Sequence, residues 1–410
     1  MKRIAVIGGG WAGIAAAVEL AGAGRAVTLF EAGRVLGGRA RTITQNGRTL
    51  DNGEHLLLGA YRETMGLMRR VGADPQRLLK RMPLTIHNNA GFHLRLPACL
   101  PAPLNLAAGL LTARGVSFSE KLATAIWMQG LKWRDFRLPV EQSVAEWLDA
   151  AGQTGRLRRE LWEPLCIAAL NTPAERASAQ IFANVLRDSL GSPHRADTDM
   201  FLPQANFGQL LPEPAAAWLK AHGAEIRSGH RVARLTPAMF DIAVDGETFA
   251  GAILAVAPQH AGPLLGRDFG FAYEPIATVY LGFPAQTALP TPLYGLHGGI
   301  GQWSIDRGNG LIACILSGHG EWEALDNDTL AATLAKELAL ASTPQWHSVI
   351  REKRATYSCR PGLARPGIES GQPHLWLAGD YTWQEYPATL EGSVRSGLAA
   401  ARACLAATAA

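Results

Sequence analysis

Three glycines at a fixed spacing follow the first apolar run of the chain. Gly8, Gly10 and Gly13 stand in "VIGGGWAGIAAA" at the G-x-G-x-x-G spacing, before an alanine-rich stretch. In a dinucleotide site these glycines make a tight turn, admit the pyrophosphate and let a helix pack on a strand. A plain glycine turn is the alternative. Glu31, eighteen residues after Gly13, stands where a carboxylate takes the ribose hydroxyls, so the sequence predicts a dinucleotide site.

A second glycine turn with two arginines follows Glu31. In "RVLGGRARTI", Gly38 precedes Arg39 and Arg41. Guanidinium groups suit phosphate oxygens because they present paired donors. A domain that binds NAD does not need this second turn, whereas a cofactor that lies extended, with a large ring beyond its phosphates, does. The motif therefore favours FAD over NAD.

A third motif, "LAGDYTWQEYPATLEGSVRSG", lies near the end of the chain. Gly379 and Asp380 end an apolar strand, so that the carboxylate can accept hydrogen bonds from a ribityl chain. Thr389 and Leu390 stand at the start of a predicted helix, whose positive end would favour a reduced, anionic flavin ring. The three motifs together predict bound FAD.

The elements that position these motifs follow from the apolar pattern. Residues 4–31 read as strand, helix and strand, whereas residues 81–204 are rich in helix-like segments. The α/β pattern returns near residue 207 and again near the C-terminal motif. We predict an α/β fold in which a Rossmann-type FAD-binding domain (1–80, 205–262 and 365–410) is interrupted by a mixed α+β substrate-binding domain (81–204 and 263–364).

Composition excludes several classes of function. The net charge is +4, and no Lys/Arg cluster interleaved with aromatic residues appears, so nucleic acid is not an expected partner. Five scattered cysteines without ligand spacing indicate neither a disulfide framework nor a metal site. No apolar run is long enough to span a membrane, and the first strand leaves no room for a signal peptide. A reduced, cytoplasmic setting is expected.

The motifs together resemble those of the flavoprotein superfamily of amine oxidases, protoporphyrinogen oxidases and phytoene desaturases. The resemblance covers the whole chain. "DNGEHLLLGAYRET" and "CIAALNTPAERASAQIFANVLRDSL" are most similar to the squalene-associated flavoproteins of bacterial hopanoid synthesis. This resemblance implies an FAD enzyme that removes the hydroxyl of hydroxysqualene to give squalene, by hydride transfer from reduced flavin. One departure is that the "DNG-x-H" stretch carries Glu54 where the family pattern leads us to expect Gln.

The resemblance also implies roles for individual residues beside the cofactor. Further cofactor contacts are expected at Ala12, Ala32, Gly53 and Val232, the last through its backbone in a strand "RVARL".

Glu54 and His55 are expected beside the flavin ring. One of them is our candidate for the proton donor to the departing hydroxyl, and a bracing role in the flavin loop is the alternative. Cys166 and Asn171 are expected to line the substrate cavity. The alternatives are a small buried hydrophobe for Cys166 and a turn or helix end for Asn171. Arg187 and Asp188 belong to the stretch that carries the resemblance, but they could equally form a surface ion pair.

Other activities stay open at this stage. A desaturase would run the flavin in the oxidative direction on an isoprenoid chain. An amine oxidase would need an aromatic cage, for which Tyr381, Trp383 and Tyr386 are available. A lipid carrier without turnover is the third alternative. Because there is only one dinucleotide motif, electrons must arrive from a separate carrier or leave to one, and the reductive reaction needs a separate electron donor for the flavin.

Two further expectations concern a helical segment and a cysteine. The segment 117–133 begins with a capping box and places Leu122, Ile126 and Trp133 near one face. That face packs on the core, or it lies on a membrane surface with Trp127 and Trp133 beside basic residues. A membrane-facing segment, for which residues 96–133 are the candidate, would attach the protein peripherally to the inner face of the cell membrane. Cys359 is expected to make no covalent bond to the flavin.

Overall fold

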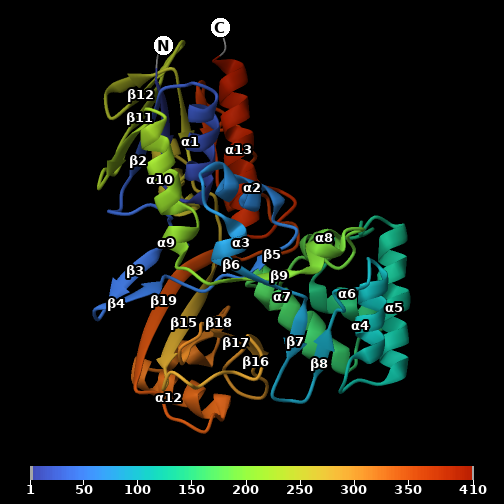
Figure 1. The fold of residues 1–410 in the computed structure, drawn as a ribbon. Coiled ribbons are helices and arrows are strands. Elements are labelled where there is room, and N and C mark those ends of the chain that lie inside the picture. Colours follow the sequence, from blue (N-terminus) through green and yellow to red (C-terminus); the bar gives the residue numbers. More distant parts are fainter. Residues whose placement is uncertain (1–2, 409–410) are drawn as a thin grey trace.

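The computed structural model describes residues 3–408. A five-stranded parallel sheet combines strands from the N-terminal, middle and C-terminal parts of the chain. Its inner strands are mostly apolar and buried, as parallel strands between helices must be, whereas the edge strand β10 (Glu225–Ser228) is polar and partly exposed. The register confirms the predicted strand–helix–strand unit (Figure 1). The strand order is β10, β2 (Val27–Glu31), β1 (Ile4–Ile7), β14 (Gly251–Leu254) and β20 (Leu375–Leu377).

Helices α1 (Trp11–Gly22) and α13 (Leu390–Ala407) lie side by side against this sheet (Figure 1). They approach closely because Gly397 has no side chain: a Cβ atom there would lie 2.1 Å from the carbonyl oxygen of Ala12. The N-termini of both helices therefore come to the same end of the sheet. The predicted α/β fold with a Rossmann-type half is confirmed.

A second, antiparallel sheet lies at the other end of the molecule (Figure 1). Helix α12 (Asn327–Leu338) packs on it through Leu330 and Leu334. Its strand order is β16 (Leu293–Gly295), β17 (Trp303–Asp306), β18 (Leu311–Ser317), β15 (Tyr273–Gly282) and β19 (Trp346–Tyr357).

A helical region lies beside the antiparallel sheet and forms one side of the molecule (Figure 1). It contains α4 (Leu104–Thr112), α5 (Phe118–Trp133), α6 (Val144–Ala150), a π-helical turn (Arg158–Trp162), α7 (Glu163–Leu170) and α8 (Ala179–Asp188). The capping box that starts α5 is present as predicted. Among the described residues, no helix combines the length and apolarity needed to cross a bilayer.

The core-facing side of α5 is not the predicted one. Leu122, Ile126 and Trp133 are exposed, Trp133 to 81%. Trp127 instead packs into the core, with its ring centroid 4.9 Å from that of Trp147. Both faces of α5 are apolar, so the hydrophobic pattern alone could not show which one is buried.

The remaining elements are short. The helices are α2 (Arg62–Arg70), α3 (Pro75–Leu78), α9 (Phe207–Leu210), α10 (Pro212–Ala221) and α11 (Pro258–Leu265). Two small sheets have the strand orders β5 (Leu57–Leu58), β9 (Met200–Pro203), β6 (Leu79–Met82) and β11 (Leu235–Pro237), β12 (Ile242–Val244), β13 (Glu247–Phe249). Two hairpins pair β3 (Thr42–Gln45) with β4 (Arg48–Asp51) and β7 (Thr85–His87) with β8 (His93–Arg95). The proposed domain boundaries at 80/81 and 262/263 fall inside β6 and α11. The boundaries at 204/205 and 364/365 fall between elements.

Candidate active site

One cavity of about 1160 Å³ extends from the end of the parallel sheet into the space between the helical region and the antiparallel sheet. We call it the main cavity. Pockets for small molecules and cofactors usually measure roughly 300–1,000 Å³, so this cavity is somewhat larger than a typical ligand site. One half is lined by the glycine loops and the motif residues of the FAD prediction. The other half is lined mainly by apolar side chains, including Leu58, Ile86, Leu165, Phe182, Val185, Leu186, Leu293, Trp303 and Ile305.

The glycine loop begins the cofactor half. Gly8 has a φ of +106°, and Gly10 is the N-cap of α1 without any side chain to cap its free amides. A Cβ atom on Gly13 would lie 1.8 Å from the Gly8 carbonyl oxygen, so only glycine lets α1 pack so closely. The open helix end presents unpaired N–H groups to the main cavity, which suits a phosphate. Gly10 also pairs with Gly37, which joins the second glycine turn to the first.

Glu31 lies at the end of β2, on the wall of the main cavity. Its carboxylate accepts hydrogen bonds from the backbone N–H of Gly9, at 2.7 Å, and of Gly33, at 2.5 Å. These bonds hold the carboxylate beside the glycine loop. Its bonds to a ribose stay a prediction.

Arg39 and Asp380 form an ion pair at 2.6 Å, although 341 residues separate them. Arg39 also donates to the carbonyl oxygen of Ala355 at 2.5 Å. Burial opposes the charge of Arg39, but Asp380 outweighs it and raises the pKa of the guanidinium. The second and third motifs, which we assigned to separate parts of the cofactor, thus meet at one point. The guanidinium of Arg41 donates to the Gly38 carbonyl, and both residues line the main cavity.

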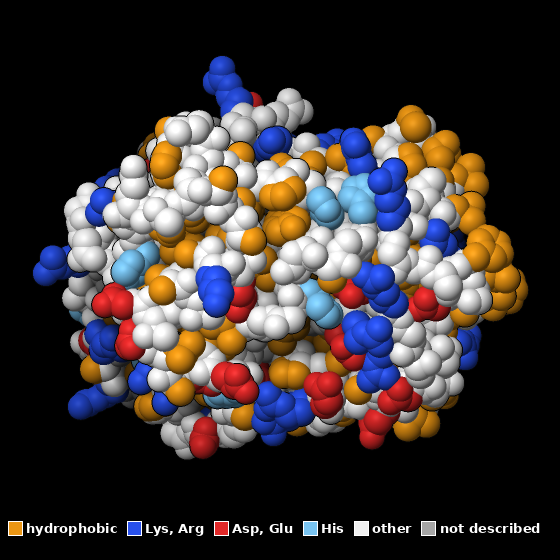
Figure 2. All heavy atoms as spheres, turned by 90° about the horizontal axis from the view of Figure 1, so that it is seen from below, with side chains coloured by type: hydrophobic (Ala, Val, Ile, Leu, Met, Phe, Trp, Pro, Cys, Tyr) orange, Lys and Arg blue, Asp and Glu red, His pale blue; other side chains and the backbone are white. Residues whose placement is uncertain are grey.

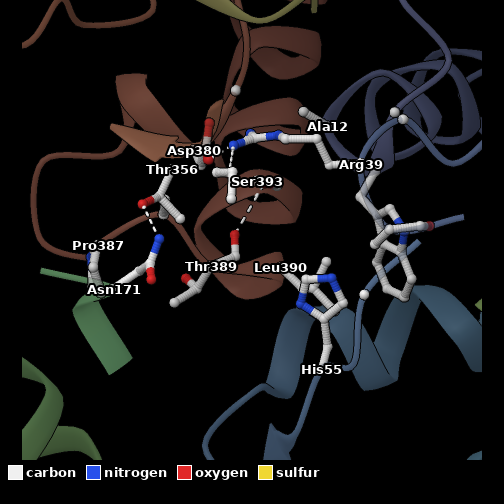
Figure 3. Close-up of a pocket in the computed structure, with 18 of the residues that line it drawn as sticks. Ala12, Arg39, His55, Asn171, Thr356, Asp380, Pro387, Thr389, Leu390 and Ser393 are labelled. Carbon is white, nitrogen blue, oxygen red and sulfur yellow. Dashed lines mark hydrogen bonds and ion pairs between the residues drawn. The ribbon is translucent and has the colours of Figure 1, made fainter. Parts of the chain in front are cut away.

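The third motif also supplies a helix end. Thr389 caps α13, its hydroxyl accepting from the N–H of Gly392 at 3.1 Å. Leu390 follows as the first residue of the helix, and both line the main cavity (Figure 3). The predicted helix start is confirmed. Its role beside a flavin ring stays a prediction.

The other expected cofactor contacts also line this half of the main cavity: Ala12, Ala32, Gly53 and Val232. The expectation of a strand at "RVARL" is wrong, because regular pairing begins only at Leu235. The N–H groups of Ala233 and Arg234 turn instead to the carboxylate of Asp245, at 3.0 and 2.8 Å.

Glu54 has partners that favour bracing over proton donation. Its carboxylate accepts from Arg307 at 2.8 Å and from the hydroxyl of Tyr280 at 3.0 Å, and the side chain is only 1% exposed. Asp51 lies 3.7 Å from the same guanidinium. We call these four residues the Glu54 cluster. Burial raises the pKa of Glu54, although Arg307 opposes the shift. The unexpected carboxylate at position 54 is therefore matched by a buried arginine.

Glu54 and His55 both line the main cavity, but within the described residues only Glu54 is held by other side chains. The His55 ring meets Phe207 edge-on, with centroids 5.0 Å apart, and Figure 3 shows it beside Leu390. Among the described residues, neither ring nitrogen has a hydrogen-bond partner. Burial, with a smaller contribution from Arg39, lowers the pKa of His55 to about 4. The imidazole is therefore neutral at pH 7 and can donate or accept a hydrogen bond.

The two expected substrate contacts differ. Asn171 lines the main cavity and, with a φ of 47°, ends α7, so its helix-ending role is also confirmed. Cys166 does not line the cavity: its thiol is fully buried and lies 3.7 Å from the Thr172 carbonyl oxygen. It sits one position past Leu165, about 100° around the helix, so Leu165 and Ala169 form the wall instead.

Cys359 also lies away from the main cavity, beside a smaller pocket of about 200 Å³. Burial raises the pKa of its thiol to about 12. Arg187 and Asp188 do form an ion pair at 2.7 Å, but Asp188 lines the main cavity and accepts from the Tyr386 hydroxyl at 2.5 Å.

Sequence reasoning missed Arg307, Tyr280 and Thr356. Each reaches the site from the antiparallel sheet, more than 180 residues from its partner in the chain. No local motif surrounds them, so only the paired strands reveal their place.

Comparisons with known proteins agree with this geometry. A family model described as "Flavin containing amine oxidoreductase" matches residues 11–405. The chain is 31% identical to hydroxysqualene dehydroxylase of Rhodopseudomonas palustris, over 99% of each chain, and 26% identical to zeta-carotene desaturase of Synechocystis, over 98% and 97%. Its fold resembles that of a redesigned putrescine oxidase, with a TM-score of 0.74 at 17% identity over 99% of each chain. The chain therefore belongs to the family of flavin-containing amine oxidoreductases and is an FAD-dependent oxidoreductase.

Proposed function

We propose that the protein reductively removes the hydroxyl of hydroxysqualene to give squalene. The observation that carries the proposal is the apolar half of the main cavity, which is continuous with the cofactor half. A long hydrocarbon chain can be buried there, and burial of apolar surface contributes roughly 25 cal/mol per Å². The similarity to hydroxysqualene dehydroxylase over the full length of both chains supports this substrate over other lipids.

The chain's residues fit the cofactor that the family implies. The open end of α1, the Arg39–Asp380 pair and the N-terminus of α13 would hold the phosphates, the ribityl chain and the ring of FAD in turn. Bound, reduced FAD supplies hydride chemistry. The alcohol takes up one hydride and one proton, the carbon–oxygen bond breaks, and a hydrocarbon and water result.

His55 is the better of the two candidates to assist the departing hydroxyl. It faces the main cavity with free ring nitrogens, whereas the Glu54 carboxylate is held by Arg307 and Tyr280. Because burial lowers the pKa of His55 to about 4, its neutral ring can donate a hydrogen bond at pH 7 without carrying a charge. Glu54 supports the loop that carries His55.

The amine oxidase alternative has weaker support. Of its three cage residues, Tyr381 and Tyr386 line the main cavity, whereas Trp383 does not. The hydroxyl of Tyr386 is also engaged by Asp188. A desaturase would need the same apolar cavity and would differ only in the direction of hydride transfer. The shape of the cavity therefore does not separate the two activities, and an assay of the reaction does.

The test is a single-turnover reaction without oxygen. Purified holoenzyme is reduced with dithionite and mixed with hydroxysqualene in detergent, and the return of the oxidised flavin absorption band is followed while the lipid is extracted. We expect reoxidation with formation of squalene, and no reoxidation with squalene itself. Absence of both signals would overturn the proposal. Oxidised enzyme that instead bleaches with a carotenoid precursor would favour the desaturase.

Two variants separate the roles of His55 and Glu54. His55→Leu, which cannot donate a hydrogen bond, should slow the reoxidation about three- to tenfold, the effect of one hydrogen bond. Glu54→Gln should react at a near-normal rate once FAD is saturating. The reverse pattern would assign the proton transfer to Glu54.

We further propose peripheral attachment to an anionic membrane surface through α4 and α5. Phe118, Ile126 and Trp133 are 67%, 65% and 81% exposed, and Figure 2 shows apolar side chains gathered at the edge of the molecule where these helices lie. Lys121 and Lys132 stand in the same helix. Amphipathic helices with such a composition lie in the headgroup region of a bilayer.

Vesicle sedimentation tests this attachment. Ile126→Ser with Trp133→Ser should release the holoenzyme from phosphatidylglycerol vesicles while FAD stays bound. Met239→Ser with Phe240→Ser is the matched control, because these residues are 79% and 76% exposed but lie on the FAD-binding side. Equal retention of both double variants would exclude α5 as the contact. A separate electron donor stays part of the proposal, because the chain has one dinucleotide motif.

A further inference from the structure

Asn171 and Thr356 form a hydrogen-bonded pair on the wall of the main cavity, opposite His55 (Figure 3). The orientation of the Asn171 amide is fixed by the backbone. Its oxygen accepts from the N–H of Gly318 at 2.8 Å, a group that can only donate. Its NH₂ group therefore points the other way, toward the hydroxyl oxygen of Thr356 at 3.0 Å.

This arrangement determines what Thr356 can do. A hydroxyl has one proton to donate and two lone pairs, and Asn171 already donates to the oxygen. Among the described residues, no group accepts the Thr356 proton. The residue is only 8% exposed and lines the main cavity, so the proton is available to a molecule bound there.

The antiparallel sheet has a bulge beside Thr356, on a strand whose Glu352 and Arg354 also line the main cavity. Glu274 of β15 pairs with Thr356, whereas Ile276 pairs with Glu352, so three residues of β19 stand opposite Pro275 alone. Proline has no N–H to continue the ladder, and bulges commonly redirect side chains beside active sites. At this break the Pro275 carbonyl accepts a hydrogen bond from the N–H of Gly318, at 3.0 Å. Gly318 is the residue whose N–H also orients the Asn171 amide.

We propose that Thr356 recognises the substrate by donating a hydrogen bond to its hydroxyl oxygen. Asn171 is a positioning residue that keeps the Thr356 proton directed into the main cavity. The apolar half of the cavity binds an isoprenoid alcohol and its hydrocarbon product almost equally, so discrimination between them falls to such a donor. This inference rests on the proposed function, since it assigns a binding group for that substrate.

Equilibrium binding tests the inference without turnover. Oxidised holoenzyme in detergent micelles is titrated with hydroxysqualene or squalene while the flavin difference spectrum is recorded. Thr356→Val keeps the shape and removes the hydroxyl, and it should weaken binding of the alcohol about three- to tenfold, the effect of one hydrogen bond, without changing binding of squalene. Thr356→Ser should restore most of the preference.

Thr278→Val is the matched control. Its hydroxyl is buried on the neighbouring strand without a partner and lies outside the cavity lining, so the preference for the alcohol should stay as in the wild type. An unchanged preference in Thr356→Val, or equal weakening of both lipids, would overturn the inference. So would a shifted flavin spectrum in lipid-free Thr356→Val, which would assign the proton to the cofactor. Failure of the proposed function appears separately, as wild-type enzyme that hydroxysqualene does not reoxidise.

Discussion

Removing Arg307 should destabilise the protein strongly, because this residue neutralises two buried carboxyl groups. Its guanidinium lies 2.8 Å from Glu54 and 3.7 Å from Asp51, and the side chains of both acids are 1% exposed. In Arg307→Leu the two carboxyl groups stay buried without their cation. Breaking a buried pair by removing one partner costs about 3–5 kcal/mol, and we expect a loss of unfolding free energy in that range.

The loss should depend on pH in a defined direction. Burial already raises the pKa of Glu54 and of Asp51 in the wild type, and removal of Arg307 raises both further. An acid whose pKa is higher in the folded state favours folding below its unfolded pKa, near 4, and loses this contribution as the pH rises through the folded pKa. The variant should therefore be closer to the wild type at pH 5 than at pH 8.

Urea unfolding of the holoenzyme, followed by far-ultraviolet circular dichroism, measures the effect at both pH values. The double variant Arg307→Leu/Glu54→Gln should recover most of the loss, because glutamine accepts from Tyr280 without carrying a charge. A loss below about 1 kcal/mol in the single variant, compared with the 3–5 kcal/mol typical of a broken buried pair, would refute the reasoning. A double variant no more stable than the single one would do the same.

Three further predictions concern the cofactor half of the main cavity. Asp380→Ala should lower FAD affinity at least tenfold, because a charged hydrogen-bond acceptor contributes about 1.5–3 kcal/mol and Arg39 loses its partner; equilibrium dialysis of the apoprotein measures this, and unaltered affinity would contradict it. Gly13→Ala should give protein without bound flavin, since the added carbon would lie 1.8 Å from the Gly8 carbonyl oxygen; a yellow, soluble variant would show that the loop can yield. Acid precipitation should leave a colourless pellet, because Cys359 lies outside the cavity lining, and colour retained in the pellet would reveal a covalent bond.

The sequence was most informative where one segment forms a feature by itself. The glycine loop, the capping box of α5 and the start of α13 each depend on neighbours within a few residues, so their spacing predicts them. The pairing of Arg39 with Asp380 depends on two segments 341 residues apart, which no local pattern encodes. The motifs placed both residues near the cofactor, but only the fold shows that they bind each other.

Two other features lay beyond local patterns for physical reasons. Trp127 and Ile126 are adjacent on a helix that is apolar on both sides, so which one meets the core depends on packing against Trp147. Thr356 lines the main cavity beside an irregular stretch of the ladder, where Pro275 stands opposite three residues of β19. A strand read from sequence alone alternates regularly and would not reveal this break.

The continuity of the main cavity has a consequence for the order in which the protein is assembled with its ligands. Residues of the cofactor half and of the apolar half line one continuous cavity, so a bound cofactor would form part of the wall that a lipid meets. Each ligand then raises the affinity of the other by the same factor, as thermodynamic linkage requires. A chain that has not yet acquired its flavin would hold lipid weakly, and one filled with lipid would release flavin slowly.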